Sequence, residues 1–186
     1  MRNNSKEYQI KAHLTAFISN YLMQISHLTK YSKKTLSNDA DNNQLVDIDI
    51  EHLAVSSQHQ KFILLKLSNN RLTYQCGRSL GSIIVHQQIC VLKLRSNCIS
   101  DAGLTILTKY LINDTNLEDF DMSNNHLSAQ SDYSIGSLLS HTKSLHSLDT
   151  SNNSISCIQQ ISQSLTMNKS LRTLDLSKYV SYKATK

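Results

Sequence analysis

The side chains best suited to chemistry in this sequence are those of four cysteines and eight histidines, which could bind zinc, act as nucleophiles or transfer protons. Cys76, Cys90, Cys98 and Cys157 lie too far apart for a zinc knuckle, and no histidine has a cysteine or carboxylate at motif spacing. The sequence also lacks a glycine-rich phosphate loop, a nucleophile elbow and a His-Glu-x-x-His motif. We therefore expect free thiols, no metal, no cofactor and no enzymatic activity.

The composition predicts one folded domain, because the chain has 186 residues, of which 39% are hydrophobic and 18% are charged. No apolar run approaches the roughly 20 residues that a membrane span needs. The first residues also lack the uninterrupted apolar segment of a secretory signal. These features predict a cytoplasmic protein without a membrane span.

The net charge of +5 is distributed unevenly along the sequence. Residues 1–36 contain six bases and one acid, whereas residues 37–60 contain five acids and no base. Residues 61–100 contain six bases and no acid, and residues 101–186 contain seven bases and eight acids. Because no aromatic stacking pattern accompanies the basic stretches, we expect no specific nucleic-acid partner.

The elements that position these side chains are predicted by an internal repeat. Its template has apolar residues at positions 1, 4, 6 and 11 and asparagine at position 9, with successive copies 26–28 residues apart. Four copies and a partial fifth begin at Phe62, Ile89, Leu117, Leu145 and Leu171. Position 9 is Asn70, Asn97, Asn125 and Asn153, and Tyr179 replaces asparagine in the last copy. Thr150 is the one polar residue at position 6 of the four full copies.

This pattern predicts a short strand followed by a returning helix in each copy. Side chains at positions 4 and 6 of the strand point the same way, into a shared core. The asparagine follows the strand, where its amide can bond backbone groups of its own turn and the adjacent one. Leu104, Leu107 and Leu111 then recur at helical spacing after Asp101, which is a plausible N-cap.

These copies resemble leucine-rich repeats, and their length is similar to that of the ribonuclease-inhibitor-like subclass found in NLR-type receptors and RanGAP-type proteins. The stretch LKLRSNCISDAGLTILTKYL carries the clearest resemblance. It implies an α/β fold, a short curved solenoid with parallel strands on the concave face and helices on the convex face. We assign the repeats to residues 62–178.

The regions outside the template have separate predictions. Residues 1–36 are predicted to be an amphipathic helical cap, with a mitochondrial transit helix and a partner-binding or coiled-coil helix as alternatives. Residues 37–61 are predicted to be an acidic loop and a degenerate capping strand, with Leu45, Ile48 and Ile50 as its apolar side. Residues 179–186 are predicted to be a tail, without a closing helix after the last strand. We therefore expect a truncated or degenerate array, or a last strand that is covered by the tail or by a partner.

The predicted concave face carries a graded column of charges at position 5, where neighbouring strands bring equivalent residues about 4.8 Å apart. The residues that we expect to bind a partner are Lys66, Lys93, Arg95, Glu118, Asp119, Asp121, Asp149 and Asp175. Opposite charges at its two ends suit a partner with the complementary pattern. The alternative interpretation is that solvent-facing strand positions are simply polar.

Two functions are consistent with these features. The first is a non-enzymatic protein–protein interaction module or scaffold that binds a protein partner, of unknown identity, through the concave face. The second, by analogy with RanGAP-type proteins, is a GTPase-activating type of regulator of a small GTPase. An exposed arginine that stabilises the transferring phosphate would be needed for that activity, and Arg71 and Arg95 are the candidates.

Overall fold

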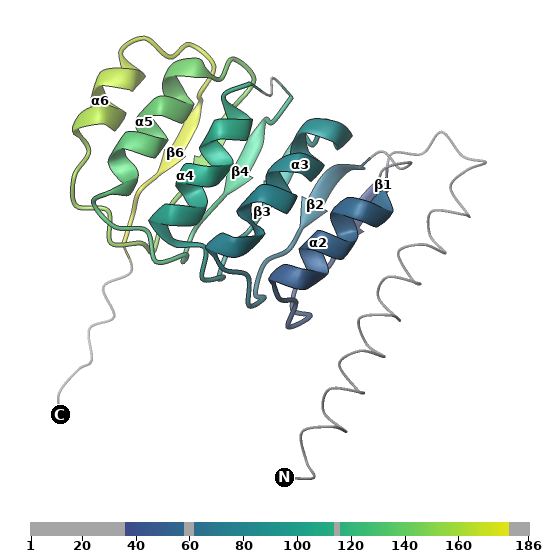
Figure 1. The fold of residues 1–186 in the computed structure, drawn as a ribbon. Helices are drawn as coiled ribbons and strands as arrows, with labels where there is room; N and C mark the ends of the chain where they lie inside the picture. The colour runs from purple at the N-terminus through teal and green to yellow at the C-terminus, as the bar shows by residue number, and fades with distance from the viewer. Residues whose placement is uncertain (1–35, 58–61, 114–115, 179–186) are drawn as a thin grey trace, which may run out of the picture.

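The computed structural model describes residues 36–57, 62–113 and 116–178 (Figure 1). The helical cap predicted for residues 1–36 and the tail at residues 179–186 therefore lie outside the described residues, apart from Leu36. The described residues form a single curved array of strand–helix units, which confirms the predicted α/β solenoid.

The sheet contains six strands that are all parallel and follow one another in chain order. Leu65 pairs in register with Leu92, and the same row continues through Phe120, Leu148 and Leu174. The predicted alignment of position 4 is therefore confirmed. The strands are β1 (Leu36–Asp39), β2 (Phe62–Lys66), β3 (Val91–Lys93), β4 (Asp119–Asp121), β5 (Ser147–Asp149) and β6 (Thr173–Asp175).

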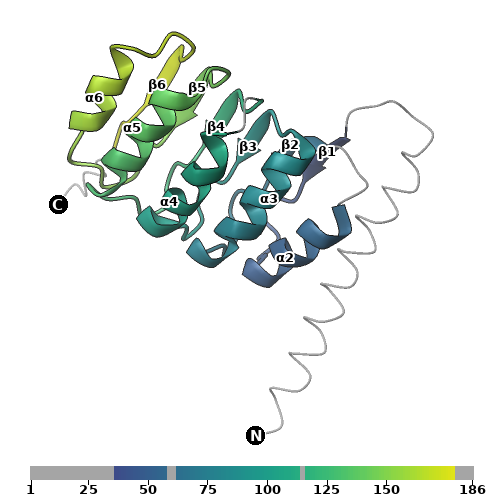
Figure 2. The same cartoon turned by 45° about the horizontal axis from the view of Figure 1, so that its top comes forward.

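Helices return the chain between successive strands and lie side by side along one face of the sheet (Figures 1 and 2). A short 3₁₀ helix, Tyr74–Cys76, precedes the second of them. The α-helices are α2 (Asp47–Ser56), α3 (Gly77–Gln87), α4 (Ser100–Leu111), α5 (Ser131–His141) and α6 (Gln159–Leu165). The other face of the sheet has no covering helix among the described residues and forms the concave side.

The core lies between the sheet and the helices and runs through the whole array. Side chains at positions 4 and 6 of β2, β3 and β4 are fully buried, as are most of the apolar helix residues predicted from their spacing. Leu165 is an exception, with 39% exposure, and Leu174 and Leu176 of the last repeat are only partly buried. Each repeat thus buries its apolar side chains against its neighbours, as stacked repeats require.

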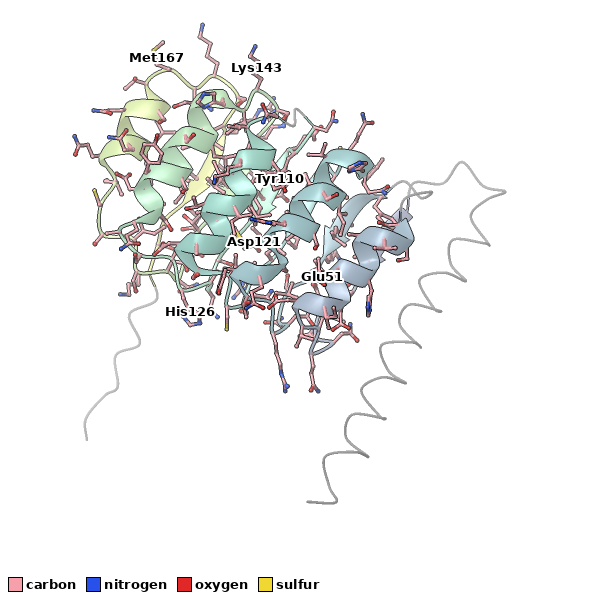
Figure 3. All side chains as sticks on the ribbon, viewed as in Figure 1. Glu51, Tyr110, Asp121, His126, Lys143 and Met167 are labelled. Atoms are coloured by element: carbon pink, nitrogen blue, oxygen red, sulfur yellow. The ribbon has the colours of Figure 1, made fainter. Side chains whose placement is uncertain are left out.

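One close contact between helices depends on a glycine. A Cβ atom added to Gly81 of α3 would lie 2.3 Å from Cδ2 of Tyr110, whose aromatic ring extends from α4 (Figure 3). Real Cβ atoms do not approach ring carbons so closely, so the absence of a side chain at residue 81 allows the ring to pack there.

The prediction of a capping strand that begins at Leu45 was wrong, whereas residues 40–46 form a loop within the predicted acidic stretch. The strand of this region is β1, at the start of that stretch, and the segment that begins at Leu45 enters α2. Because Asp39 pairs with Lys66, residues 36–57 form a further repeat in which Asn43 takes position 9 and Leu45 takes position 11. The template missed this repeat because its position 4 is Asn38.

The prediction that Asp101 caps its own helix was also wrong. Helix α4 begins after Ile99 without a side-chain cap. The carboxylate of Asp101 instead accepts hydrogen bonds from the backbone nitrogen and hydroxyl of Ser128, at 2.8 and 2.6 Å, and from the hydroxyl of Ser131. Asp101 therefore connects its own repeat to the next.

Candidate functional site: the concave sheet face

The predicted position-5 residues lie in one column on the sheet. The strand register aligns Asp39 of β1 with Lys66, and each following strand adds the equivalent residue of the next repeat. The whole column is Asp39, Lys66, Lys93, Asp121, Asp149 and Asp175. In the repeats of β2 to β5 the side chains at positions 4 and 6 are buried in the core, so the position-5 residues between them belong to the concave face. The strand register places Asp39 and Asp175 in the same column.

Both lysines of this column are paired with carboxylates. Lys66 Nζ lies 2.9 Å from Asp39 Oδ2, and Lys93 Nζ lies 2.6 Å from Asp119 Oδ2 on the neighbouring strand. The hydrogen bond between Lys66 and Asp39 raises the pKa of the lysine and lowers the pKa of the aspartate. The charge of the expected basic end is therefore largely compensated by two acids, Asp39 and Asp119.

The three aspartates at the other end of the column are held in place without a cation. Asp121 Oδ1 accepts hydrogen bonds from the backbone nitrogen and hydroxyl of Ser123, at 2.9 and 2.6 Å. Asp149 and Asp175 accept from the backbone nitrogen of the serine two residues later, both at 2.8 Å. No salt bridge to these aspartates occurs within the described residues. They form a row of fixed, half-buried negative charges, which we call the acidic row; Figure 3 labels Asp121.

Beside the lysines, the concave face is apolar. Leu64 of β2 and Val91 of β3, which pair in register at position 3, are half-buried, and Ile63, next to Leu64 at the start of β2, is 39% exposed. The residues equivalent to Leu64 on β4, β5 and β6 are polar, namely Asp119, Ser147 and Thr173. We call Ile63, Leu64 and Val91 the apolar patch. The sequence analysis did not identify it, although the strand FILLK has apolar residues on both of its faces.

The remaining predicted residues are distributed more widely. Arg95 follows β3 and is exposed, and Glu118 precedes β4 and is also exposed. Arg71 is exposed, but it follows Asn70 in the turn after β2 and is not part of the sheet. The two arginines proposed for GTPase regulation therefore do not occupy equivalent positions in their repeats.

The turns that follow the strands are joined by the asparagines at position 9. Asn97 Nδ2 donates to the carbonyls of Leu67 in the preceding repeat and Leu94 in its own, both at 2.9 Å. Its Oδ1 accepts from the backbone nitrogen of Leu72 at 3.0 Å. Asn70, Asn125 and Asn153 make equivalent bonds. The structural role predicted for these asparagines is confirmed.

Position 8 has a backbone requirement that the sequence analysis missed. In the first repeat and in the four full copies, the residue at this position adopts a left-handed conformation, with φ between 53° and 61°. These residues are Asn42, Asn69, Ser96, Asn124 and Asn152. Asparagine tolerates this conformation better than most residues, so its recurrence before position 9 was the available signal.

The described residues show little potential for metal or thiol chemistry. They include no group of three or more His, Cys, Asp or Glu side chains arranged to hold a metal ion. All four cysteines lie among the described residues and are thiols not joined in disulfides, as predicted, and burial raises the pKa of the Cys76 thiol to about 12. Among the helices described, none combines the length and apolarity needed to cross a membrane.

No protein-family model matches the sequence. Over 117 residues it is 32% identical to "NACHT, LRR and PYD domains-containing protein 3" of Rattus norvegicus, a match that covers 61% of this chain and 11% of the relative. The proteins of the same name from Mus musculus and Macaca mulatta are 31% and 28% identical over equally long matches. The chain thus spans only a small part of these relatives.

A solved structure titled "Leiomodin-1 Actin-Binding Site 2 (ABS2)" has a similar fold, with a TM-score of 0.60. The match covers 70% of this chain and 76% of the leiomodin chain, at 16% sequence identity. The chain has a leucine-rich-repeat fold. Its sequence relationship to NACHT, LRR and PYD domains-containing protein 3 agrees with that fold.

Proposed function

We propose that this chain is a non-enzymatic protein–protein interaction module, or scaffold, that binds a protein partner through its concave sheet face. The observation that carries the proposal is the combination of the acidic row with the apolar patch on one exposed face of the sheet. Apolar contacts supply binding energy, and fixed charges select a partner with complementary charge. A partner that complements this face therefore presents basic residues next to an apolar segment.

The fixed geometry of the acidic row favours recognition of another macromolecule. Serine hydrogen bonds orient Asp121 and Asp149 before any partner arrives, so little side-chain freedom is lost on binding. Asp121 Oδ2 and Asp149 Oδ2 take part in no hydrogen bond or salt bridge found among the described residues, which leaves these atoms for a partner's cations.

The similar proteins support this proposal by analogy. The leiomodin structure is titled an actin-binding site, so a fold of this kind serves for protein binding in that case. We propose from the repeat length and the resemblance to NLR-type receptors that the repeats belong to the ribonuclease-inhibitor-like subclass. We also propose, from the sequence features described above, that the protein is cytoplasmic.

The experiment compares proteins captured from the source organism's lysate by three forms of the chain. The test variant is Asp121→Asn/Asp149→Asn, which keeps an oxygen to accept the serine bonds. The control is Ser162→Lys/Gln163→Lys, at exposed sites of α6, and changes the net charge by the same amount. We expect a set of proteins that the wild type and the control capture equally and the test variant captures at least about tenfold less, which corresponds to roughly 1.4 kcal/mol. Equal capture by all three forms would refute a role for the acidic row.

GTPase regulation is the alternative, supported by the exposure of Arg71 and Arg95. It predicts that the chain accelerates GTP hydrolysis by at least one member of a panel of small GTPases. It also predicts that Arg71→Ala or Arg95→Ala removes this effect without loss of folding. An arginine that stabilises transferring phosphate contributes roughly 10³–10⁵ in rate, so the loss is measurable.

A further inference from the structure

The first repeat has an outer surface that is unusual for this array. Ile48 and Val55 of α2 are 48% and 71% exposed and lie seven residues apart, two helical turns along one face. The exposed residues Glu51 and His52 lie between them on that face. We call Ile48, Glu51, His52 and Val55 the α2 face; Figure 3 labels Glu51. Ile48 and Val55 can pack against the apolar side of an amphipathic helix, and the Glu51 carboxylate between them attracts basic residues of that helix.

The first repeat is also strongly acidic. Five acids and no base occur in residues 37–60. Among the described residues, only Asp39 of these acids forms a salt bridge. Three others accept hydrogen bonds from uncharged groups: Asp41 from Ser68, Asp47 from Thr73, and Asp49 from Val46. The fifth, Glu51, lies on the α2 face, so this end of the solenoid attracts a cationic segment.

The chain itself contains a segment of the complementary chemistry. Residues 1–35 contain six bases and one acid and lead directly into β1, the strand at the edge of the sheet nearest α2. Within residues 4–28, the apolar residues recur at helical spacing: Ile10, Leu14, Phe17, Ile18, Tyr21, Ile25 and Leu28. Of the six bases, Lys6 and Lys11 lie within residues 4–28, together with Glu7, and Lys30, Lys33 and Lys34 lie between this amphipathic stretch and the acidic repeat.

We propose that residues 4–28 form a helix that packs on the α2 face of the same chain. The seven residues from 29 to 35 can extend over roughly 23–25 Å, about two to three times the usual 8–10 Å between packed helices. The C-terminal end of the array also exposes apolar side chains, including Leu165 and Met167. It lies four strand spacings farther along the sheet than α2, about 19 Å, and lacks the acidic surroundings of α2. Charge and reach together favour the α2 face.

The test is hydrogen exchange of residues 10–28 in the full-length protein. The variant Ile48→Asp/Val55→Asp makes the α2 face polar and acidic. The control Val85→Asp/Tyr133→Asp makes the same change at apolar residues of α3 and α5 that are 46% and 74% exposed. We expect amides 10–28 to be protected in the wild type and the control, and to exchange at least about tenfold faster in the α2 variant.

Three outcomes would overturn the proposal. The first is equal exchange of amides 10–28 in the wild type and the α2 variant, and the second is an equal effect of the control. The third is protection that disappears on dilution, because this would show that a second copy covers the α2 face. If the α2 variant unfolds, as judged by amides in β3 and β4, Glu51→Lys decides the matter. It should accelerate exchange of residues 10–28 about threefold at low salt and less at high salt, and unchanged exchange would refute the proposal.

Discussion

The asparagines at position 9 provide the sharpest test of how this solenoid is stabilised, because their hydrogen bonds differ in number. Asn125 is fully buried, and its Oδ1 accepts one bond, from the backbone nitrogen of Ile99 at 3.3 Å. Asn153 is 7% exposed, but its Oδ1 accepts from the backbone nitrogens of both Asn125 and Leu127, each at 2.9 Å. Burial alone predicts that Asn125 is the more costly residue to lose.

The bonding pattern predicts the opposite order. In Asn125→Ala, the carbonyls of Leu94 and Met122 keep donors from Asn97 and Asn153, so the nitrogen of Ile99 loses its acceptor. In Asn153→Ala, two backbone nitrogens lose their acceptor, and the carbonyl of Thr150 loses the bond donated by Asn153. At about 1–3 kcal/mol for each buried unsatisfied group, the expected losses are about 1–3 kcal/mol for Asn125→Ala and about 3–9 kcal/mol for Asn153→Ala.

Urea unfolding followed by circular dichroism measures these losses, and Ser156→Ala at an exposed site serves as the control. A domain of this size is typically stable by about 5–15 kcal/mol, so both losses should be measurable. Hydrogen exchange of amides in β3 and β4 separates global destabilisation from fraying of the last repeat. Equal losses, or a larger loss for Asn125→Ala, would show that the count of unsatisfied backbone groups does not determine the cost.

Two further predictions concern contacts between neighbouring repeats. Gly81→Ala should lower the free energy of unfolding by about 1–3 kcal/mol, because its Cβ would collide with the Tyr110 ring. For Gly77→Ala, the added Cβ atom would lie no closer than 3.1 Å to its nearest neighbour, so the loss in free energy of unfolding should be smaller in the same urea unfolding assay. A larger loss for Gly77→Ala than for Gly81→Ala would contradict this explanation. Burial raises the pKa values of Asp101 and Asp132, but hydrogen bonds from the next repeat outweigh it and leave both pKa values lowered. The stabilisation is therefore present above the unfolded-state pKa of about 3.9 and is lost as the pH falls through the lower folded-state values. The urea midpoint should decrease on acidification below about pH 4, and Asp101→Asn/Asp132→Asn should reduce that decrease; an unchanged pH profile would refute the linkage.

Most of the fold could be predicted from the sequence because the repeat makes each residue's environment recur. Once leucine occupies positions 4 and 6 in several copies, burial of the apolar side requires stacking in chain order. The first repeat was missed because Asn38 occupies position 4 and because Ile48 and Ile50 alternate with aspartates as in a strand. Asn43 and Leu45 lie one repeat before Asn70 and Leu72, and their spacing was the evidence for this repeat that the template missed.

The candidate site was less predictable, because charges on neighbouring strands interact in ways that a list by position does not reveal. The column at position 5 follows from the template, but the pairing of Lys93 with Asp119 joins position 5 of one strand to position 3 of the next. The bonds from Asp101 to Ser128 likewise join repeats. Such contacts depend on side-chain reach between copies, whereas periodicity reports only what each copy has in common.

Each asparagine at position 9 forms hydrogen bonds with the turn of the preceding copy. This arrangement limits how the chain can change in length. Duplicating or deleting one whole unit of 26–28 residues preserves the pairing of every asparagine with a preceding turn. Deleting a few residues inside the stretch from position 1 to position 11 breaks that pairing at two turns. Evolution could therefore lengthen or shorten the array in whole units, whereas small internal deletions would be removed by selection.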